Sequence, residues 1–353
     1  MVQESLVIRQ FRQDDCLSYI VFDRSSLQAM VVDPRLDLTN DYREFLSQSG
    51  CRVIYSVETR LHTDHLSAAH LFGCEHLMPE KASSQRSVRK LRDGEKFQLG
   101  KHQIQAMHAP AATDDGLILK SDSWLLTGDA LWIGSVENAL LPNANVQAIW
   151  SLARKLSADM SENFLIYPGH DRMGILFSTL GVEKKRNPLF QTSSLEKLQE
   201  SLSENRPARY DQDSLDRMRY NQMGGQSESD IPTVRPGAFG SRNYAEYGAT
   251  RISVEKFKKK LEEHAAGFEF VDVREPAEFD LGHMPGMRNV TLSDLGAELP
   301  RLMSAKRVYV SCLSGLRSAL AARTLGYLGL KDVVVISGGY QAWNQAGYPV
   351  TEK

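Results

Sequence analysis

The sequence has few cysteines for its length. Only four occur among 353 residues, and no two of them form a Cys-x-x-Cys pair: Cys16, Cys51, Cys74 and Cys312. This scarcity argues against a disulfide framework and against a zinc ribbon, because both need several cysteines at short spacing. Any cysteine with a special role is therefore expected to be special through its reactivity.

Long apolar runs and an excess of charge of one sign are also missing. No stretch reaches about 18 consecutive apolar residues, and charges are spread through the N-terminal segment, so we expect a cytoplasmic protein without a membrane span. The composition is 42% hydrophobic and 24% charged, with a formal net charge of -2. Such a balance gives no basic field for nucleic acid, so we expect small molecules or proteins as partners.

The length predicts two domains, because single domains commonly hold about 100 to 200 residues. From residue 5 to residue 171, short β-type runs alternate with polar turns and helical stretches, as in an α/β or αββα sandwich. Residues 224–249 collect glycine, serine, proline and charge without apolar periodicity. We predict a linker there, between a first domain over residues 1–223 and a second over residues 250–353.

The second domain alternates predicted strands with predicted helices. Apolar runs at 268–273, 307–312 and 332–339 predict strands, and the segments 252–264 and 314–330 predict helices. This alternation favours an α/β domain built on a small parallel sheet.

Cys312 ends the second of these strands, just before a helix expected to begin near Ser314 or Gly315. Backbone N–H groups in such a loop point inward, and the helix dipole adds about half a positive charge, so the site favours a thiolate or persulfide anion. Gly315 permits the tight backbone path, and Arg317 adds a fixed cation at the far edge of the loop. The alternative is a buried structural cysteine.

The loop Cys-Leu-Ser-Gly-Leu-Arg-Ser is preceded by FVDVREPAEFDLGHMPGMRNV and followed by ISGGYQAW. This order and spacing resembles the rhodanese family over about the last hundred residues. There the cysteine takes a sulfane sulfur from a donor, holds it as a persulfide and passes it to a thiophilic acceptor, with no cofactor. The resemblance implies that Cys312 is the nucleophile and that the loop cradles the anion through Leu313, Ser314, Gly315, Leu316 and Arg317. It also implies that Asp272, Arg274 and Glu278 support the fold and the loop.

Three polar segments of the first domain hold metal-ligand side chains: TRLHTDH at 59–65, TGD at 127–129 and YPGHD at 167–171. Histidines and carboxylates at strand ends suit zinc or non-haem iron. Together with MGILFSTLGVEKKRNP after the last segment, they resemble the metallo-β-lactamase superfamily and, within it, the persulfide dioxygenases. The resemblance implies an N-terminal αββα sandwich.

The first domain departs from the dioxygenase pattern at two iron ligands. Arg60 stands where the family's Thr-His-x-His-x-Asp-His motif has its first histidine, and Ala112 stands where a Pro-Gly-His-Thr turn has another. The third family ligand corresponds to Asp129. Alanine has no donor atom and arginine stays protonated, so two of three ligands are lost. The family's glutathione-holding segment after TGD is also replaced, by SVENALLPN.

The remaining cluster includes the residues that hold the second metal in binuclear relatives: His62, Asp64, His65, Asp129 and His170. A single iron or zinc ion there is one expectation. The other is that Arg60 pairs with Asp129 and balances the charge without an ion.

The leading hypothesis is a rhodanese-type sulfurtransferase working through a Cys312 persulfide, beside a degenerate first domain kept as scaffold, binding platform or oligomerisation unit. Its expected partners are small sulfur donors and thiol acceptors, such as thiosulfate and glutathione persulfide, and the dioxygenase resemblance adds a homodimer. Three alternatives stay open: a working persulfide dioxygenase and rhodanese fusion that oxidises glutathione persulfide to sulfite, a metal-dependent hydrolase, and a non-enzymatic persulfide carrier or sensor.

Overall fold

The computed structural model describes residues 6–202, 210–223, 250–263 and 266–352. These residues form two compact units, which we call the first and the second domain. The second consists of the described residues from 250 onward together with 174–178, and the first holds the rest. The predicted linker at 224–249 lies outside the described residues.

Two six-stranded sheets form the core of the first domain, with the orders β1-β2-β3-β4-β5-β6 and β12-β11-β10-β9-β8-β7. The strands of one sheet are β1 (Leu6–Gln13), β2 (Cys16–Asp23), β3 (Gln28–Val32), β4 (Arg52–Val57), β5 (Glu75–Pro79) and β6 (Arg89–Leu91). Those of the other are β7 (Lys96–Leu99), β8 (His102–His108), β9 (Leu117–Lys120), β10 (Trp124–Gly128), β11 (Leu165–Pro168) and β12 (Ser178–Thr179).

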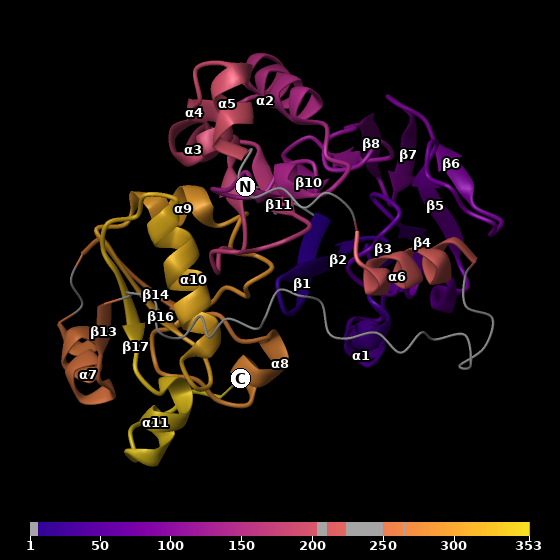
Figure 1. Cartoon of the computed structure of the whole chain (residues 1–353). Coiled ribbons are helices and arrows are strands. Elements are labelled where there is room, and N and C mark those ends of the chain that lie inside the picture. The colour runs from indigo at the N-terminus through magenta and orange to yellow at the C-terminus, as the bar shows by residue number, and fades with distance from the viewer. Residues whose placement is uncertain (1–5, 203–209, 224–249, 264–265, 353) are drawn as a thin grey trace. The chain divides into compact units, whose positions relative to one another are not determined.

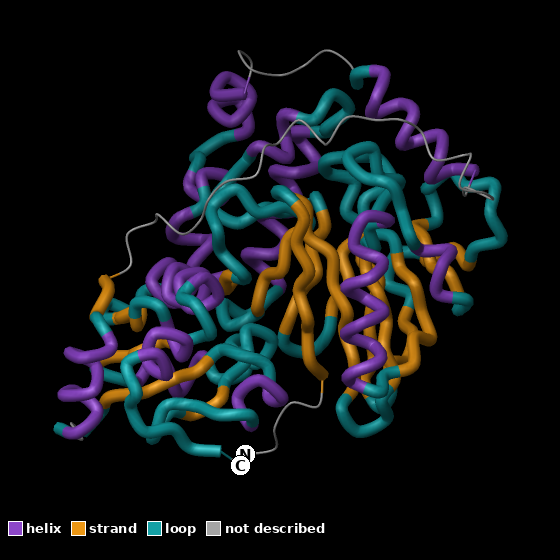
Figure 2. Tube along the Cα trace, turned by 90° about the horizontal axis from the view of Figure 1, so that it is seen from below, coloured by secondary structure: helices purple, strands orange, loops and turns teal. Residues whose placement is uncertain are grey.

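Helices surround the two sheets (Figure 1). They are α1 (Thr39–Ser49), α2 (Val146–Asp159), α3 (Leu180–Arg186), α4 (Pro188–Gln191), α5 (Leu195–Leu202) and α6 (Gln212–Met223), with 3-10 turns η1 (Leu36–Leu38), η2 (Ala69–Phe72) and η3 (Glu137–Leu140). Tyr42 of α1 packs into an apolar cluster with Ile20 and Val31 of the first sheet. Helices α2 to α5 gather beside β10 and β11 (Figure 1), and Figure 2 shows the strands of the sheets between helices. The predicted αββα sandwich is confirmed.

The sheet topology brings the three polar segments of the first domain together. Strands β10 and β11 are parallel neighbours, with Gly128 opposite Pro168, so the segments after them leave the sheet at the same edge. The Leu117 N–H donates to the Thr59 carbonyl oxygen at 2.8 Å, which ties the segment after β4 to the second sheet. Side chains far apart in sequence therefore meet beyond these three strand ends.

The second domain is built on a five-stranded sheet of order β13-β17-β16-β14-β15, and all four neighbouring pairs are parallel. Its strands are β13 (Thr250–Ile252), β14 (Phe268–Asp272), β15 (Arg288–Asn289), β16 (Arg307–Ser311) and β17 (Val333–Ile336). Its helices are α7 (Val254–Glu262), α8 (Pro276–Asp280), α9 (Leu299–Ser304), α10 (Leu316–Tyr327) and α11 (Gly339–Gln345). The predicted small parallel sheet is confirmed.

No helix in the described part of the chain is long and apolar enough to cross a membrane.

Candidate functional site

Cys312 lies in the turn between the buried strand β16 and helix α10. Gly315 is the N-cap of α10 and has a φ of 106°, a left-handed conformation that favours glycine. The Gly315 N–H donates to the Cys312 sulfur at 3.1 Å, and the thiol lies 3.6 Å from the Ser318 hydroxyl. The thiol is 1% exposed and sits at the positive end of a 12-residue helix. The Gly315 N–H and the helix end favour negative charge on the sulfur, whereas the Ser318 hydroxyl donates to the Gly315 carbonyl oxygen at 3.2 Å.

The segment at the start of helix α11 forms hydrogen bonds with the Cys312 turn. The Tyr340 N–H donates to the Cys312 carbonyl oxygen at 2.8 Å, and the Gln341 N–H donates to that of Leu313 at 2.9 Å. Gly339 has a φ of 56°, and a Cβ there would overlap the Cys312 carbonyl oxygen. The glycines of the ISGGYQAW segment therefore let two backbones approach closely.

Asp272 and Arg274 form a buried ion pair that supports the turn before α8. Arg274 Nε donates to both carboxylate oxygens of Asp272, at 3.1 and 3.0 Å. Its Nη2 donates to the Gly282 carbonyl oxygen at 2.9 Å and its Nη1 to that of Glu278 at 3.1 Å. These contacts match the structural role expected of the pair.

Glu278 and Arg317 form a bidentate ion pair at the Cys312 loop. Arg317 Nη1 lies 2.6 Å from Glu278 Oε2, and Nη2 lies 2.7 Å from Oε1. The hydrogen bond from Arg317 lowers the pKa of Glu278 and the same contact raises the pKa of Arg317. Arg317 is thus held in place at the loop edge, and the Glu278 carboxylate neutralises its charge.

Arg60 stands at the centre of the histidine cluster in the first domain. Its Nε lies 2.5 Å from Asp129 Oδ2 and its Nη2 lies 2.5 Å from Asp64 Oδ1, with the side chain 3% exposed. Burial opposes the charge of Arg60, but Asp129 and Asp64 outweigh it and raise its pKa. The predicted pairing of Arg60 with Asp129 is confirmed, and it extends to Asp64.

The three histidines of the cluster each contact a carboxylate. His170 Nδ1 lies 2.6 Å from Asp129 Oδ1, and His65 Nδ1 lies 2.8 Å from Asp64 Oδ2. His62 Nε2 lies 2.9 Å from Asp33 Oδ1. Burial opposes protonation of His62, yet Asp33 raises its pKa to about 10. The structure thus gathers all five predicted residues and adds Asp33.

Cys16, at the start of β2, is a member of the cluster that the sequence pattern missed. Its sulfur lies 3.4 Å from Asp64 Oδ2 and 3.3 Å from His170 Nε2. Cys16, Asp64 and His170 have donor atoms close enough to hold one metal ion, as do His62, Asp64 and His65. A thiolate ligand suits zinc. No local motif marks Cys16, because its partners are 48 and 154 residues away in the chain.

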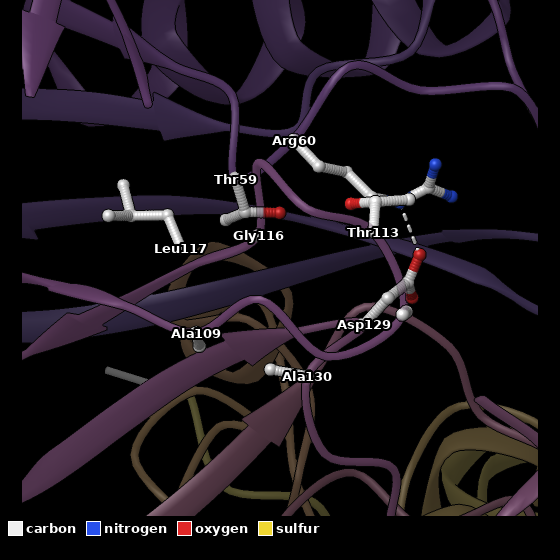
Figure 3. A pocket seen from close by; sticks show the side chains of 9 residues that line it. Thr59, Arg60, Ala109, Thr113, Gly116, Leu117, Asp129 and Ala130 are labelled. Carbon is white, nitrogen blue, oxygen red and sulfur yellow. Dashed lines mark hydrogen bonds and ion pairs between the residues drawn. The ribbon is translucent and has the colours of Figure 1, made fainter. Parts of the chain in front are cut away.

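A narrow cavity is lined by Arg60 and Ala112, the two positions at which the iron ligands are lost. Figure 3 shows Arg60 directed at Asp129 across it, with Thr59, Thr113 and Ala130 on its walls. The cavity is too small to admit a water molecule. A guanidinium and a methyl group replace two nitrogen donors, so these residues do not fit the iron of a persulfide dioxygenase.

Comparisons with known proteins agree with both domains. The family model described as "Rhodanese-like domain" matches residues 253–346. The chain is 37% identical over 99 residues to thiosulfate sulfurtransferase 16, chloroplastic, of Arabidopsis thaliana, covering 24% of this chain and 80% of the relative. It is 26% identical over 216 residues to the mitochondrial persulfide dioxygenase ETHE1 of Bos taurus, covering 58% of this chain and 85% of the relative.

A solved structure shows the same fold over nearly the whole chain. The metallo-β-lactamase structure from Staphylococcus aureus covers 95% of this chain and 99% of its own, with a TM-score of 0.56 at 16% identity. The molecule is thus a fusion of a metallo-β-lactamase-fold domain with an α/β domain. Through its C-terminal domain the chain belongs to the rhodanese family, and its N-terminal domain is similar to persulfide dioxygenases. Both resemblances are confirmed.

Proposed function

We propose that this protein is a rhodanese-type sulfurtransferase that moves sulfane sulfur through a persulfide on Cys312. The observation that carries the proposal is the placement of the Cys312 sulfur at the N-terminus of α10, 3.1 Å from the Gly315 nitrogen. The N–H donor and the helix dipole stabilise a sulfur anion at this position, both as the thiolate and as the persulfide. The relatives of the second domain support the same chemistry.

The transfer proceeds in two displacement steps. The Cys312 thiolate attacks the outer sulfur of the donor, the sulfur–sulfur bond of the donor breaks, and the donor's remaining part leaves with the electron pair. A nucleophilic acceptor then attacks the outer sulfur of the Cys312 persulfide and releases the thiolate. No external oxidant or reductant is needed, because each step exchanges one sulfur bond for another.

In this proposal the first domain no longer works as an iron dioxygenase. Arg60 occupies one carboxylate oxygen of Asp129 and one of Asp64. A cation held at 2.5 Å from both carboxylates supplies the charge that a metal would supply and excludes a second cation from that position. We assign the domain a structural or binding role.

The test is thiocyanate formation from glutathione persulfide and cyanide. Wild-type protein should turn over, and Cys312→Ser should reduce the enzymatic rate to the uncatalysed background. Cys74→Ser is the matched control and should keep the wild-type rate. A Cys312→Ser variant with wild-type turnover would remove Cys312 from the mechanism, whereas stoichiometric persulfide on Cys312 without turnover would favour the carrier or sensor alternative.

A further inference from the structure

The Cys312 loop carries a single charged residue, Arg317, and the Glu278 carboxylate neutralises its charge. Residues 312–317 read Cys-Leu-Ser-Gly-Leu-Arg, so Arg317 is the cation of the loop. Both terminal nitrogens of Arg317 face the Glu278 carboxylate, at 2.6 and 2.7 Å. This geometry neutralises the guanidinium with one full negative charge. An anion approaching Cys312 therefore meets an ion pair, not a free arginine.

Helix α8 fixes the Glu278 carboxylate in this position. The Glu275 N–H donates to Glu278 Oε2 at 3.1 Å, as part of a capping box at the start of the helix. Arg274, itself buried, donates to the Glu278 carbonyl oxygen at 3.1 Å. Arg317 is also close enough to Cys312 for the thiolate charge to act on its pKa. Releasing Arg317 toward a ligand therefore requires breaking the fixed pair.

The rest of the exposed loop rim carries no charge, since it consists of Leu313, Ser314 and Leu316. Leu313 is 43% exposed and Leu316 is 64% exposed, and both belong to the loop itself. A small dianion placed against this rim loses hydration and meets the Gly315 N–H and the helix dipole but no full counter-charge. A persulfide group carries one negative charge and loses less hydration, and its organic carrier can cover the leucine side chains.

We propose that Cys312 takes its sulfur from an organic persulfide in preference to thiosulfate, and that Glu278 sets this preference by neutralising Arg317. The inference rests on the proposed transfer through Cys312. In the favoured step the thiolate attacks the outer sulfur of R–S–SH, the sulfur–sulfur bond to the carrier breaks, and the carrier leaves as a thiolate that takes up a proton. Thiosulfate would instead release the sulfite dianion beside Glu278.

The experiment compares kcat/KM for glutathione persulfide and for thiosulfate, with cyanide as the acceptor and the Cys312→Ser background subtracted. Wild-type protein should favour the persulfide by at least about tenfold, the effect of one unfavourable charge contact. Glu278→Gln should raise kcat/KM for thiosulfate by about tenfold and change that for the persulfide by less than about threefold. Added salt should reduce the increase in kcat/KM for thiosulfate that Glu278→Gln produces.

Glu298→Gln is the matched control. Glu298 also pairs with an arginine, Arg288, at 2.7 Å, and its side chain is 32% exposed against 34% for Glu278. This variant should leave the donor ratio unchanged. Arg317→Gln leaves Glu278 unpaired and should lower the thiosulfate rate further, in the direction opposite to Glu278→Gln.

Equal use of both donors by wild-type protein would overturn the inference. So would an unchanged donor ratio in Glu278→Gln that retains persulfide activity. If Glu278→Gln fails to fold, the donor preference of wild-type protein and of Arg317→Gln tests the inference instead. A donor ratio in Arg317→Gln equal to that of wild-type protein would overturn the role of Glu278. Failure of the underlying sulfur transfer has a different signature, because neither donor would then yield thiocyanate above the Cys312→Ser background.

Discussion

At the scale of single residues, Arg60 shows how one substitution changes a metal-type site into an ion-paired one. The carboxylates of Asp64 and Asp129 are buried, and burial of unpaired charge costs several kcal/mol. Arg60 offsets this cost by contacting both of them at 2.5 Å. A neutral histidine in place of Arg60 would not balance these two negative charges by itself.

Removal of Arg60 is therefore expected to destabilise the protein strongly. Arg60→Ala should lower the free energy of unfolding by about 3 to 5 kcal/mol, because two buried carboxylates lose the guanidinium they share and keep only histidine contacts. Urea unfolding at neutral pH measures the change. The control is Arg92→Ala, since Arg92 is 77% exposed and pairs with Glu80 at the surface, where the loss should stay within about 1 kcal/mol. Equal effects of the two variants would contradict the role of Arg60.

The residue scale is also where sequence reasoning reached its limit. Arg60 and Ala112 could be recognised as lost ligands because they interrupt motifs, and the pairing of Arg60 with Asp129 followed from charge. Cys16 and Asp33 carry no such motif, since they join the cluster only through contacts made across the sheet. The Glu278 partner of Arg317 lies 39 residues away in the chain and escaped notice for the same reason.

At the scale of elements, the neighbouring parallel strands β4 and β5 are linked by a buried pair. Glu58, just after β4, lies 2.8 Å from His76 of β5, with side chains 1% and 8% exposed. Burial opposes the charge of Glu58, but His76 outweighs it and lowers the pKa of Glu58 to about 2. A carboxyl group with a lowered pKa contributes stability above its unfolded pKa, and this is lost as pH falls through the folded value.

Wild-type protein should therefore lose stability between pH 4.5 and pH 2 more steeply than Glu58→Gln. The stabilisation in question is up to about 3 kcal/mol, from the difference between the folded and unfolded pKa values. The measurement is the free energy of unfolding of both proteins across this pH range. Parallel curves would show that Glu58 does not respond to the pairing seen in the structure.

The contact between the Cys312 turn and the start of α11 makes a second prediction at this scale. Gly339→Ala should lower kcat/KM for sulfur transfer by at least about tenfold, because the new methyl group overlaps the Cys312 carbonyl oxygen and must displace the turn. Gly347→Ala is the matched control: Gly347 also has a positive φ, of 68°, but a Cβ there meets nothing within 4 Å. Similar activity loss in both variants would point to backbone strain alone.

The elements themselves were largely predictable. The strands β14, β16 and β17 and the helices α7 and α10 fall within the predicted segments, because each shows an apolar run or helical periodicity. Strands β13 and β15 were not predicted, since they hold only 3 and 2 residues and form by pairing with longer neighbours. Apolar patterning identifies elements that have an apolar face of their own and misses those that depend on a partner strand.

At the scale of the whole molecule, our proposal joins a domain with a working thiol site to another whose iron ligands are replaced. This asymmetry predicts that iron-loaded protein consumes no oxygen with glutathione persulfide. The variant Arg60→His with Ala112→His restores two nitrogen donors beside Asp129 and should bind more iron than wild-type protein, as elemental analysis would show. Near-stoichiometric iron in wild-type protein would contradict the interpretation of the Arg60 cluster.

The most direct test of the central claim is peptide mass spectrometry of the full chain after exposure to one equivalent of glutathione persulfide. We predict that the peptide containing Cys312 gains one sulfur atom and loses it on addition of cyanide, while those containing Cys51 and Cys74 do not change. A sulfur atom that appears on another cysteine instead, or that cyanide does not remove from Cys312, would contradict transfer through the Cys312 persulfide.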